Sequence, residues 1–89
     1  MEKHWMIVGG WWWGKAETLS EAIANAKRHG GDDVNDNDSR RFIYKVDPGS
    51  YINDFGGITH PGGTDEPEKI AELPVGVKVN LNTLAKVLV

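Results

Sequence analysis

The stretch TLSEAIANAKRHGG, residues Thr18 to Gly31, predicts the element around which the rest of the chain folds. Its first four residues form a capping box, in which the Thr18 hydroxyl accepts from the amide of Glu21 and the Glu21 carboxylate reaches back to the amide of Thr18. Apolar side chains then recur at helical spacing, at Leu19, Ala22, Ile23 and Ala26. Basic residues fill the last turn and two glycines follow, so we expect an amphipathic helix that ends at these glycines.

Two segments on either side of this helix carry strand patterns. His4 to Val8 is short and rich in β-forming residues, which predicts a buried strand. Arg40 to Asp47 alternates, which predicts a strand with one mostly apolar face. That face carries Phe42, Tyr44 and Val46, and the other face carries Arg41, Ile43 and Lys45. Between helix and strand, Asp32 to Ser39 is polar apart from one valine and predicts a mobile surface loop.

The second half of the chain is divided by turns. Tyr51 to Thr59 follows a Pro-Gly turn and predicts a strand antiparallel to its predecessor. Asp65 to Glu68 predicts the start of a short helix that ends by Pro74. Val75 to Asn82 alternates again and predicts a strand, and the apolar end from Leu84 to Val89 is expected to dock. Together the segments predict an α+β fold in the order β-α-β-β-(short α)-β, with one main helix packed on a small, mainly antiparallel sheet.

Composition limits the class of molecule. The chain has 89 residues and a mass of 9.8 kDa, which suits a single domain over residues 1–89 with a thin core. It has no cysteine, so disulfides are excluded, and association of several copies is the remaining common way to bury more surface. A net charge of −3 provides no basic field for duplex nucleic acid. No apolar run is long enough to cross a bilayer, so we expect a soluble, cytoplasmic protein.

The stretch GGWWWGK, Gly9 to Lys15, matches most of a phosphate-binding loop. A strand precedes it and a helix follows, as such a loop requires. However, Ala16 lacks the hydroxyl that would bind magnesium, and three indoles suit a curled loop backbone poorly. The helix cap at Thr18 also comes too late for Lys15 to lie in the first helical turn. We therefore do not expect hydrolysis of nucleoside triphosphates.

The three indoles need another explanation. In an extended backbone Trp11 and Trp13 share one face and Trp12 takes the other. A thin core can absorb two of them, which leaves at least one large apolar surface exposed. Two roles remain open for this surface: packing in the core or between subunits, and stacking on a ligand.

A ligand site could combine the indoles with cations able to meet phosphates and with a histidine in a glycine-rich loop. The candidate ligand-binding residues are Trp11, Trp12, Trp13, Lys15, Arg40, Arg41 and His60. We expect no metal site, because the histidines are scattered without ligand spacing, and we expect no cofactor. We also expect no catalytic residue, because no serine or threonine has an obvious base nearby. The chain therefore reads as a binding protein and not as an enzyme.

Short motifs lie along residues 5–61: Trp13-Gly14-Lys15, Thr18-Leu19-x-Glu21-Ala22, Ala26-Lys27, Gly30-Gly31, Tyr44-x-Val46-x-Pro48 and Gly56-Gly57-Ile58. Together they resemble small accessory proteins of tailed bacteriophages. The resemblance implies a short, early-expressed protein that acts on the host by binding more often than by turnover. Some compact phage proteins of this size are oligomeric sponges that sequester cyclic nucleotides or related immune signals, and this analogy of class carries over no site residues.

Two functions are therefore expected. The first is a homo-oligomeric protein of the host cytoplasm that sequesters a nucleotide-like ligand or immune signal and so counters host defence, with its pocket between subunits. The alternative is an inhibitor that binds a host enzyme or defence complex through the indoles. In that role the acidic segment Asp32 to Asp38 would face a basic partner.

Overall fold

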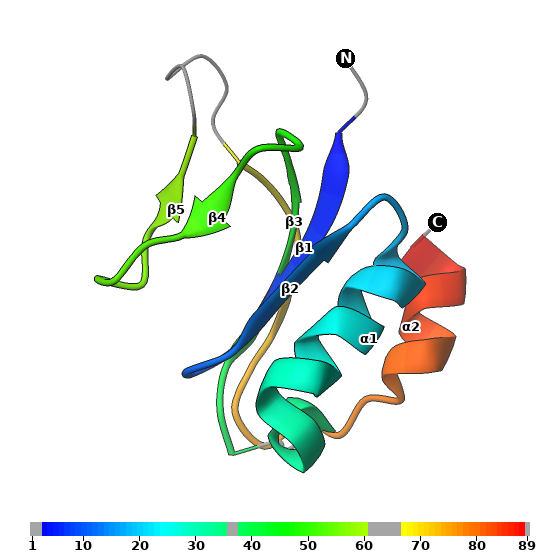
Figure 1. The fold of residues 1–89 in the computed structure, drawn as a ribbon. Coiled ribbons are helices and arrows are strands. Elements are labelled where there is room, and N and C mark those ends of the chain that lie inside the picture. Colours follow the sequence, from blue (N-terminus) through cyan, green and yellow to red (C-terminus); the bar gives the residue numbers. More distant parts are fainter. Residues whose placement is uncertain (1–2, 36–37, 61–66, 89) are drawn as a thin grey trace.

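The computed structural model describes residues 3–35, 38–60 and 67–88 of the chain. The fold is α+β, as predicted: helices cover one face of a small antiparallel sheet (Figure 1). The main sheet has four strands in the order β2-β1-β3-β6, and a separate two-stranded sheet projects to one side. The elements are β1 His4–Val8, β2 Trp13–Ala16, α1 Leu19–Gly30, the 3-10 helix η1 Gly31–Asn35, β3 Arg41–Val46, β4 Tyr51–Ile52, β5 Ile58–Thr59, β6 Glu68–Leu73 and α2 Leu81–Leu88.

Helix α1 forms where the sequence predicts it. The Thr18 side chain accepts a hydrogen bond from the Glu21 amide at 3.2 Å, which satisfies one of the unpaired donors at the helix start. Gly31 ends the helix with a φ of 57°, and its N–H donates to the Lys27 carbonyl. The left-handed backbone favours glycine at this position, so the end of α1 is set locally.

The core lies between α1 and the sheet. The apolar stripe of α1 belongs to one core cluster with Leu81 and Ala85 of α2 and with buried side chains from three strands: Trp5, Ile7, Ile43 and Leu73. At Gly14 of β2, a Cβ would lie 2.2 Å from the Ala22 carbonyl oxygen and 2.4 Å from the Ala26 amide nitrogen. Strand and helix therefore approach backbone to backbone, which only glycine permits.

The buried face of β3 is not the one that the alternation suggested. Ile43 lies in the core and Arg41 is fully buried, whereas Phe42 and Tyr44 are half-buried on the other face. The reason is that apolar side chains occur on both faces of this sheet: Val46 on the second face is also buried. Alternation alone cannot tell which of two such faces meets the helix.

Residues 51–59 do not form a single strand beside β3. They form a hairpin in which β4 pairs only with β5, through Tyr51 with Thr59 and Ile52 with Ile58. The neighbours of β3 are β1 and β6, so no side of β3 is left for β4. The prediction of one Gly-interrupted strand was therefore wrong.

Two further predictions in the second half were wrong. Glu68–Leu73 is strand β6 and not a helix, because pairing with β3 outweighs the helix propensity of this segment. Val75 to Asn82 is not a strand: its start is a turn in which Gly76 has a φ of 88°, and its end enters helix α2, where Asn80 Oδ1 accepts from the amides of Asn82 and Thr83. The predicted helix start at residues 65 and 66 lies outside the described part of the chain.

The segments that flank the helices also differ in part from expectation. Residues 31–35 form η1 with Val34 fully buried, so the predicted surface loop is anchored at its start, while residues 36 and 37 lie outside the described part. Docking of the chain end is confirmed over α2, where Ala85 is buried and Leu84 and Leu88 pack against the core.

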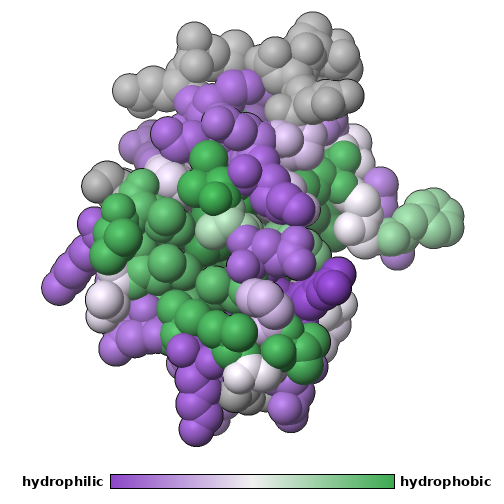
Figure 2. Space-filling view, turned by 180° about the vertical axis from the view of Figure 1, so that it is seen from behind, coloured by the Kyte–Doolittle hydropathy of each residue, from purple (hydrophilic) through white to green (hydrophobic). Residues whose placement is uncertain are grey.

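Apolar surface gathers on the α2 side of the back of the molecule, framed by hydrophilic side chains (Figure 2). Among the described residues, neither helix has the length and apolar character needed to span a bilayer.

Both edges of the main sheet carry polar features. On β2, the Lys15 carbonyl accepts a hydrogen bond from the Asn25 side chain of α1 at 3.0 Å. On β6, the register with β3 shifts near Ile43, and Lys69 pairs with Glu72 at 3.2 Å. Edge strands are protected from pairing with other chains by irregularities and charges of this kind.

Candidate functional site

The turn between β1 and β2 holds the indole triplet. The Gly9 amide donates to the Trp12 carbonyl at 2.9 Å, which closes a tight connection between the two strands. Trp12 points inward and is 2% exposed. A Cβ on Gly9 would lie 2.2 Å from its ring and one on Gly30 would lie 2.7 Å from it. The glycines around the indoles therefore make the space that Trp12 fills, and they do not form a phosphate-binding loop.

The neighbouring indoles have different environments. Trp11 is 67% exposed, and its Nε1 donates to Asp33 Oδ2 of η1 at 3.0 Å. Trp13 is half-buried at the start of β2. The triplet thus places one indole in the core, one on the surface and one between them, which matches the expectation that at least one stays exposed.

The β4–β5 hairpin lies opposite this turn. The Asn53 side chain shapes its tip, where Oδ1 accepts from the amides of Phe55 and Gly57 at 2.9 and 3.1 Å. Nδ2 of the same residue donates to Thr59 Oγ1 at 3.2 Å. Gly56 has a φ of 82°, so the turn depends on a glycine there. The tip is thus closed by its own hydrogen bonds, and Phe55 on it is 98% exposed.

An aromatic cleft of about 500 Å³ separates the Trp turn from this hairpin. Its lining residues are Val8, Gly9, Gly10, Trp11, Trp12, Trp13, Ile52, Asn53, Asp54 and Gly56. The Asn53 side chain already forms hydrogen bonds within the hairpin, so it is not available to a ligand. Among the described lining residues, the charged group is the Asp54 carboxylate. No Lys, Arg or His is among the described residues that line the cleft. The cleft therefore presents indole faces beside a single negative charge.

Lys15 lies outside the aromatic cleft. Its amino group donates to the carbonyl oxygens of Pro48 and, at 2.9 Å, of Ser50, so it holds the β3–β4 connection against β2. Partial burial lowers the pKa of this amino group below its usual value. A cation engaged in this way is poorly placed to receive a phosphate.

The other predicted cations and the predicted histidine do not converge with the indoles. Arg41 is fully buried and its Nη2 donates to the Val77 carbonyl at 2.8 Å, while Arg40 is exposed with its Nε 3.9 Å from Glu72. His60 lies 3.4 Å from the hydroxyl of Ser50, away from the cleft. Of the seven predicted ligand residues, the cleft brings together only the three indoles.

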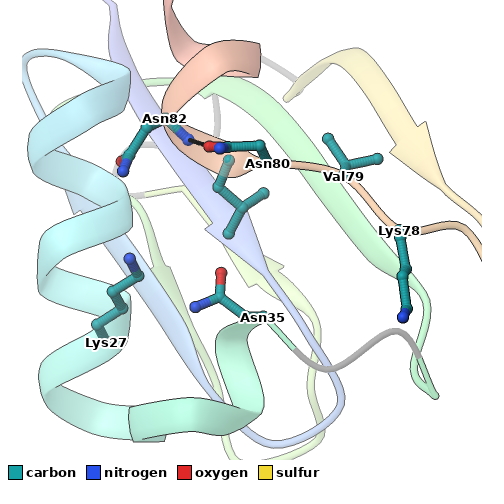
Figure 3. Close-up of a pocket in the computed structure, with 7 residues that line it drawn as sticks. Lys27, Asn35, Lys78, Val79, Asn80 and Asn82 are labelled. Carbon is teal, nitrogen blue, oxygen red and sulfur yellow. Dashed lines mark hydrogen bonds between the residues drawn. The ribbon is translucent and has the colours of Figure 1, made fainter.

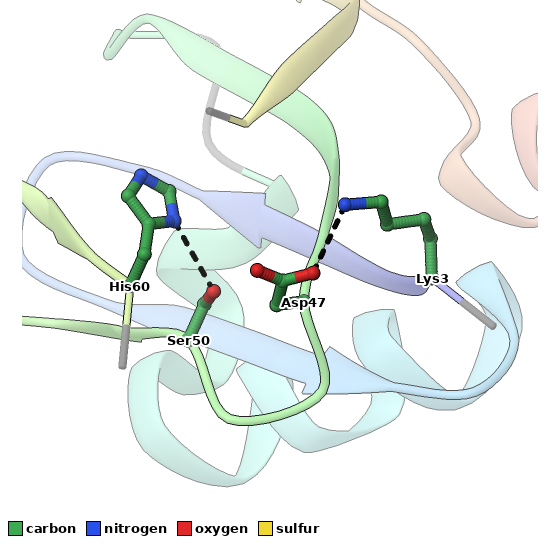
Figure 4. A network of polar contacts seen from close by, with 4 residues as sticks. All are labelled: Lys3, Asp47, Ser50 and His60. Atoms are coloured by element: carbon green, nitrogen blue, oxygen red, sulfur yellow. Dashed lines mark hydrogen bonds and ion pairs between the residues drawn. The ribbon is translucent and has the colours of Figure 1, made fainter. Parts of the chain in front are cut away.

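The contact between Ser50 and His60 was missed from the sequence. Figure 4 shows the two side chains facing each other, while the nearby Asp47 carboxylate points to Lys3, with which it pairs at 2.9 Å. A serine does therefore have a histidine nearby. Ser50 is fully buried, however, and a buried hydroxyl cannot reach a substrate. We read the pair as an anchor for the hairpin.

Sequence reasoning also missed Asp54 and Phe55. The signal was present as the turn-forming run Asn53-Asp54-Phe55-Gly56-Gly57, which favours a hairpin tip over a continuous strand. Among the described residues, no group of three or more His, Asp or Glu side chains could hold a metal ion.

Comparisons with known proteins add no constraint. No protein-family model matches the chain, and no curated protein and no solved structure matches it.

Proposed function

We propose that this chain is a binding protein whose aromatic cleft receives a basic segment of a partner protein. The observation that carries the proposal is the pairing of exposed aromatic surface with one carboxylate, Asp54, in a cleft without a lining cation. An Arg or Lys side chain gains both from stacking over an indole face and from a charge-assisted hydrogen bond to a carboxylate. A phosphate would gain neither.

The surroundings of the cleft favour a protein over a small molecule. Trp11 and Phe55 stand exposed on either side, and large aromatic side chains on a surface are frequent anchors of protein interfaces. Asp33, which holds Trp11, adds a second negative charge beside the cleft. The resemblance to accessory proteins of tailed phages supports a host protein as the partner, and inhibition of that partner as the outcome.

The first expectation, a sponge for nucleotides with a pocket between subunits, stays a prediction that the aromatic cleft does not test. The cations nominated to bind phosphates, Lys15, Arg40 and Arg41, lie outside the cleft.

A peptide titration tests the proposal. A short peptide rich in Arg and Lys should quench or shift the Trp fluorescence, and a peptide of the same length with Gln at those positions should not. Asp54→Asn should weaken binding of the basic peptide about tenfold, since it removes one charge-assisted contact. Glu17→Gln, which alters an exposed carboxylate outside the cleft, is the matched control and should leave binding unchanged.

Equal binding of the two peptides, or equal effects of the two variants, would refute the assignment. If the basic peptide binds as expected, the natural partner is sought by affinity capture from host lysate. A partner that uses the cleft is retained by the wild type and by Glu17→Gln, and is lost from both Trp11→Ala and Phe55→Ala.

A further inference from the structure

A second cavity, of about 530 Å³, lies away from the aromatic cleft. Figure 3 shows it between the last turns of α1, the end of η1 and the segment that leads into α2. Its size falls within the range of about 300–1,000 Å³ that is usual for small-molecule sites. The cavity is independent of the proposed partner site, because the two share no lining residue.

Two lysines give this cavity a positive charge. Lys27 comes from α1 and Lys78 from the segment before α2, on opposite sides in Figure 3. Within the described part of the chain, neither amino group forms a hydrogen bond or an ion pair, and no carboxylate lines the cavity. In a chain with a net charge of −3, such a site is a local exception that suits an anion.

The lysines, and not the backbone amides at the N-terminus of α2, would supply the contacts to that anion. The amides of Asn82 and Thr83 at the start of α2 already donate to the Asn80 side chain. They are therefore not available to a ligand, and the positive charge of the cavity comes from its side chains.

The remaining lining suits a nucleobase. Asn35 and Asn82 line the cavity, and in the described structure neither side-chain amide is used in a hydrogen bond. A side-chain amide offers a donor and an acceptor in the geometry that pairs with the edge of adenine. The apolar part of the lining comes from Val79, which is half-buried, and from Leu81, which is 2% exposed, and a flat ring can lie on these side chains.

We propose that this cavity binds a nucleotide, with its phosphates at Lys27 or Lys78 and its base against Val79 and the two asparagine side chains. The site differs from the one that the indoles suggested. It goes beyond the proposed binding of a partner protein and would stand if that proposal failed.

Calorimetric titrations with ATP, adenosine and inorganic tripolyphosphate test this site. ATP should bind more tightly than either fragment, because each fragment keeps only one half of the contacts. Lys27→Gln and Lys78→Gln should together weaken ATP binding at least about tenfold and leave adenosine unaffected. Lys86→Gln, an exposed lysine of α2 outside the cavity, is the matched control.

Three results would overturn the proposal. One is the absence of ATP binding at millimolar concentration, and another is an unchanged affinity in the double lysine variant. The third is tripolyphosphate binding as tightly as ATP, which would remove the role of the base. The aromatic cleft is tested separately, because Trp11→Ala should leave ATP binding unchanged.

Discussion

Replacing Gly9 by alanine tests whether the glycines next to the indoles exist to admit Trp12. A Cβ on Gly9 would lie 2.2 Å from Cε2 and Cζ2 of the Trp12 ring, which is far inside van der Waals contact. Overpacking a filled core costs about 1–3 kcal/mol, and the stiffer unfolded chain returns about 0.4–1 kcal/mol. The variant should therefore lose about 1–2 kcal/mol of unfolding free energy. In a domain of this size, each kcal/mol lowers the melting temperature by about 4–8 °C.

The adjacent glycine supplies the matched control. A Cβ on Gly10 would meet nothing closer than Ser39 Oγ at 3.5 Å, and the backbone φ of Gly10 is not positive. Gly10→Ala should therefore be neutral or stabilising by up to about 1 kcal/mol. Both variants are measured by urea unfolding and by thermal unfolding followed by circular dichroism.

A double-mutant cycle identifies the cause of the loss. Trp12→Leu removes the ring atoms that the new Cβ would meet, so Gly9→Ala should cost nothing in that background. The coupling energy between the two positions should be about 1–2 kcal/mol. All four proteins are compared in sucrose, which keeps the weaker variants folded. The same cost for Gly9→Ala in both backgrounds, or equal costs for Gly9→Ala and Gly10→Ala, would refute the reasoning.

Three further outcomes are expected. Thr18→Ala should lower the unfolding free energy in urea by about 1 kcal/mol through loss of the helix cap, whereas Ser20→Ala on the exposed side of α1 should be nearly neutral. Asn25→Ala should cost about 1 kcal/mol in the same assay, because the Lys15 carbonyl loses its donor. In an NMR titration, the Lys15 amino group should have a pKa below 10.5, because burial disfavours its charged form. The folded chain then releases this proton before the unfolded chain does, so unfolding free energy should rise with pH between the lowered pKa and 10.5. Lys15→Met should remove that rise, and a flat difference between the two proteins would contradict it.

Helix α1 and strand β1 were predictable because their signals are local. Thr18 sets the start of the helix, Gly31 sets its end, and the apolar spacing between them sets its buried face. Strand β6 was not predictable in this way. Its residues favour a helix by propensity, and it becomes a strand because β3 offers an open side to pair with.

The candidate site was predictable in part for the same reason. The exposure of one indole followed from the limited volume of a small core. Which indole enters the core depends on Gly9 and Gly30, which are far apart in sequence and meet only in the fold. The cations lie apart from the aromatic cleft because each side chain has a partner that the sequence does not reveal, such as the Val77 carbonyl for Arg41.

The protected edges of the main sheet have a consequence for how this protein behaves when it is concentrated. With Asn25 on the carbonyl of β2 and charges with a register shift on β6, neither outer strand offers a continuous ladder to another polypeptide. Fibril growth by strand addition is thereby opposed at both ends of the sheet. Docking of another polypeptide as an extra strand of the main sheet is opposed for the same reason.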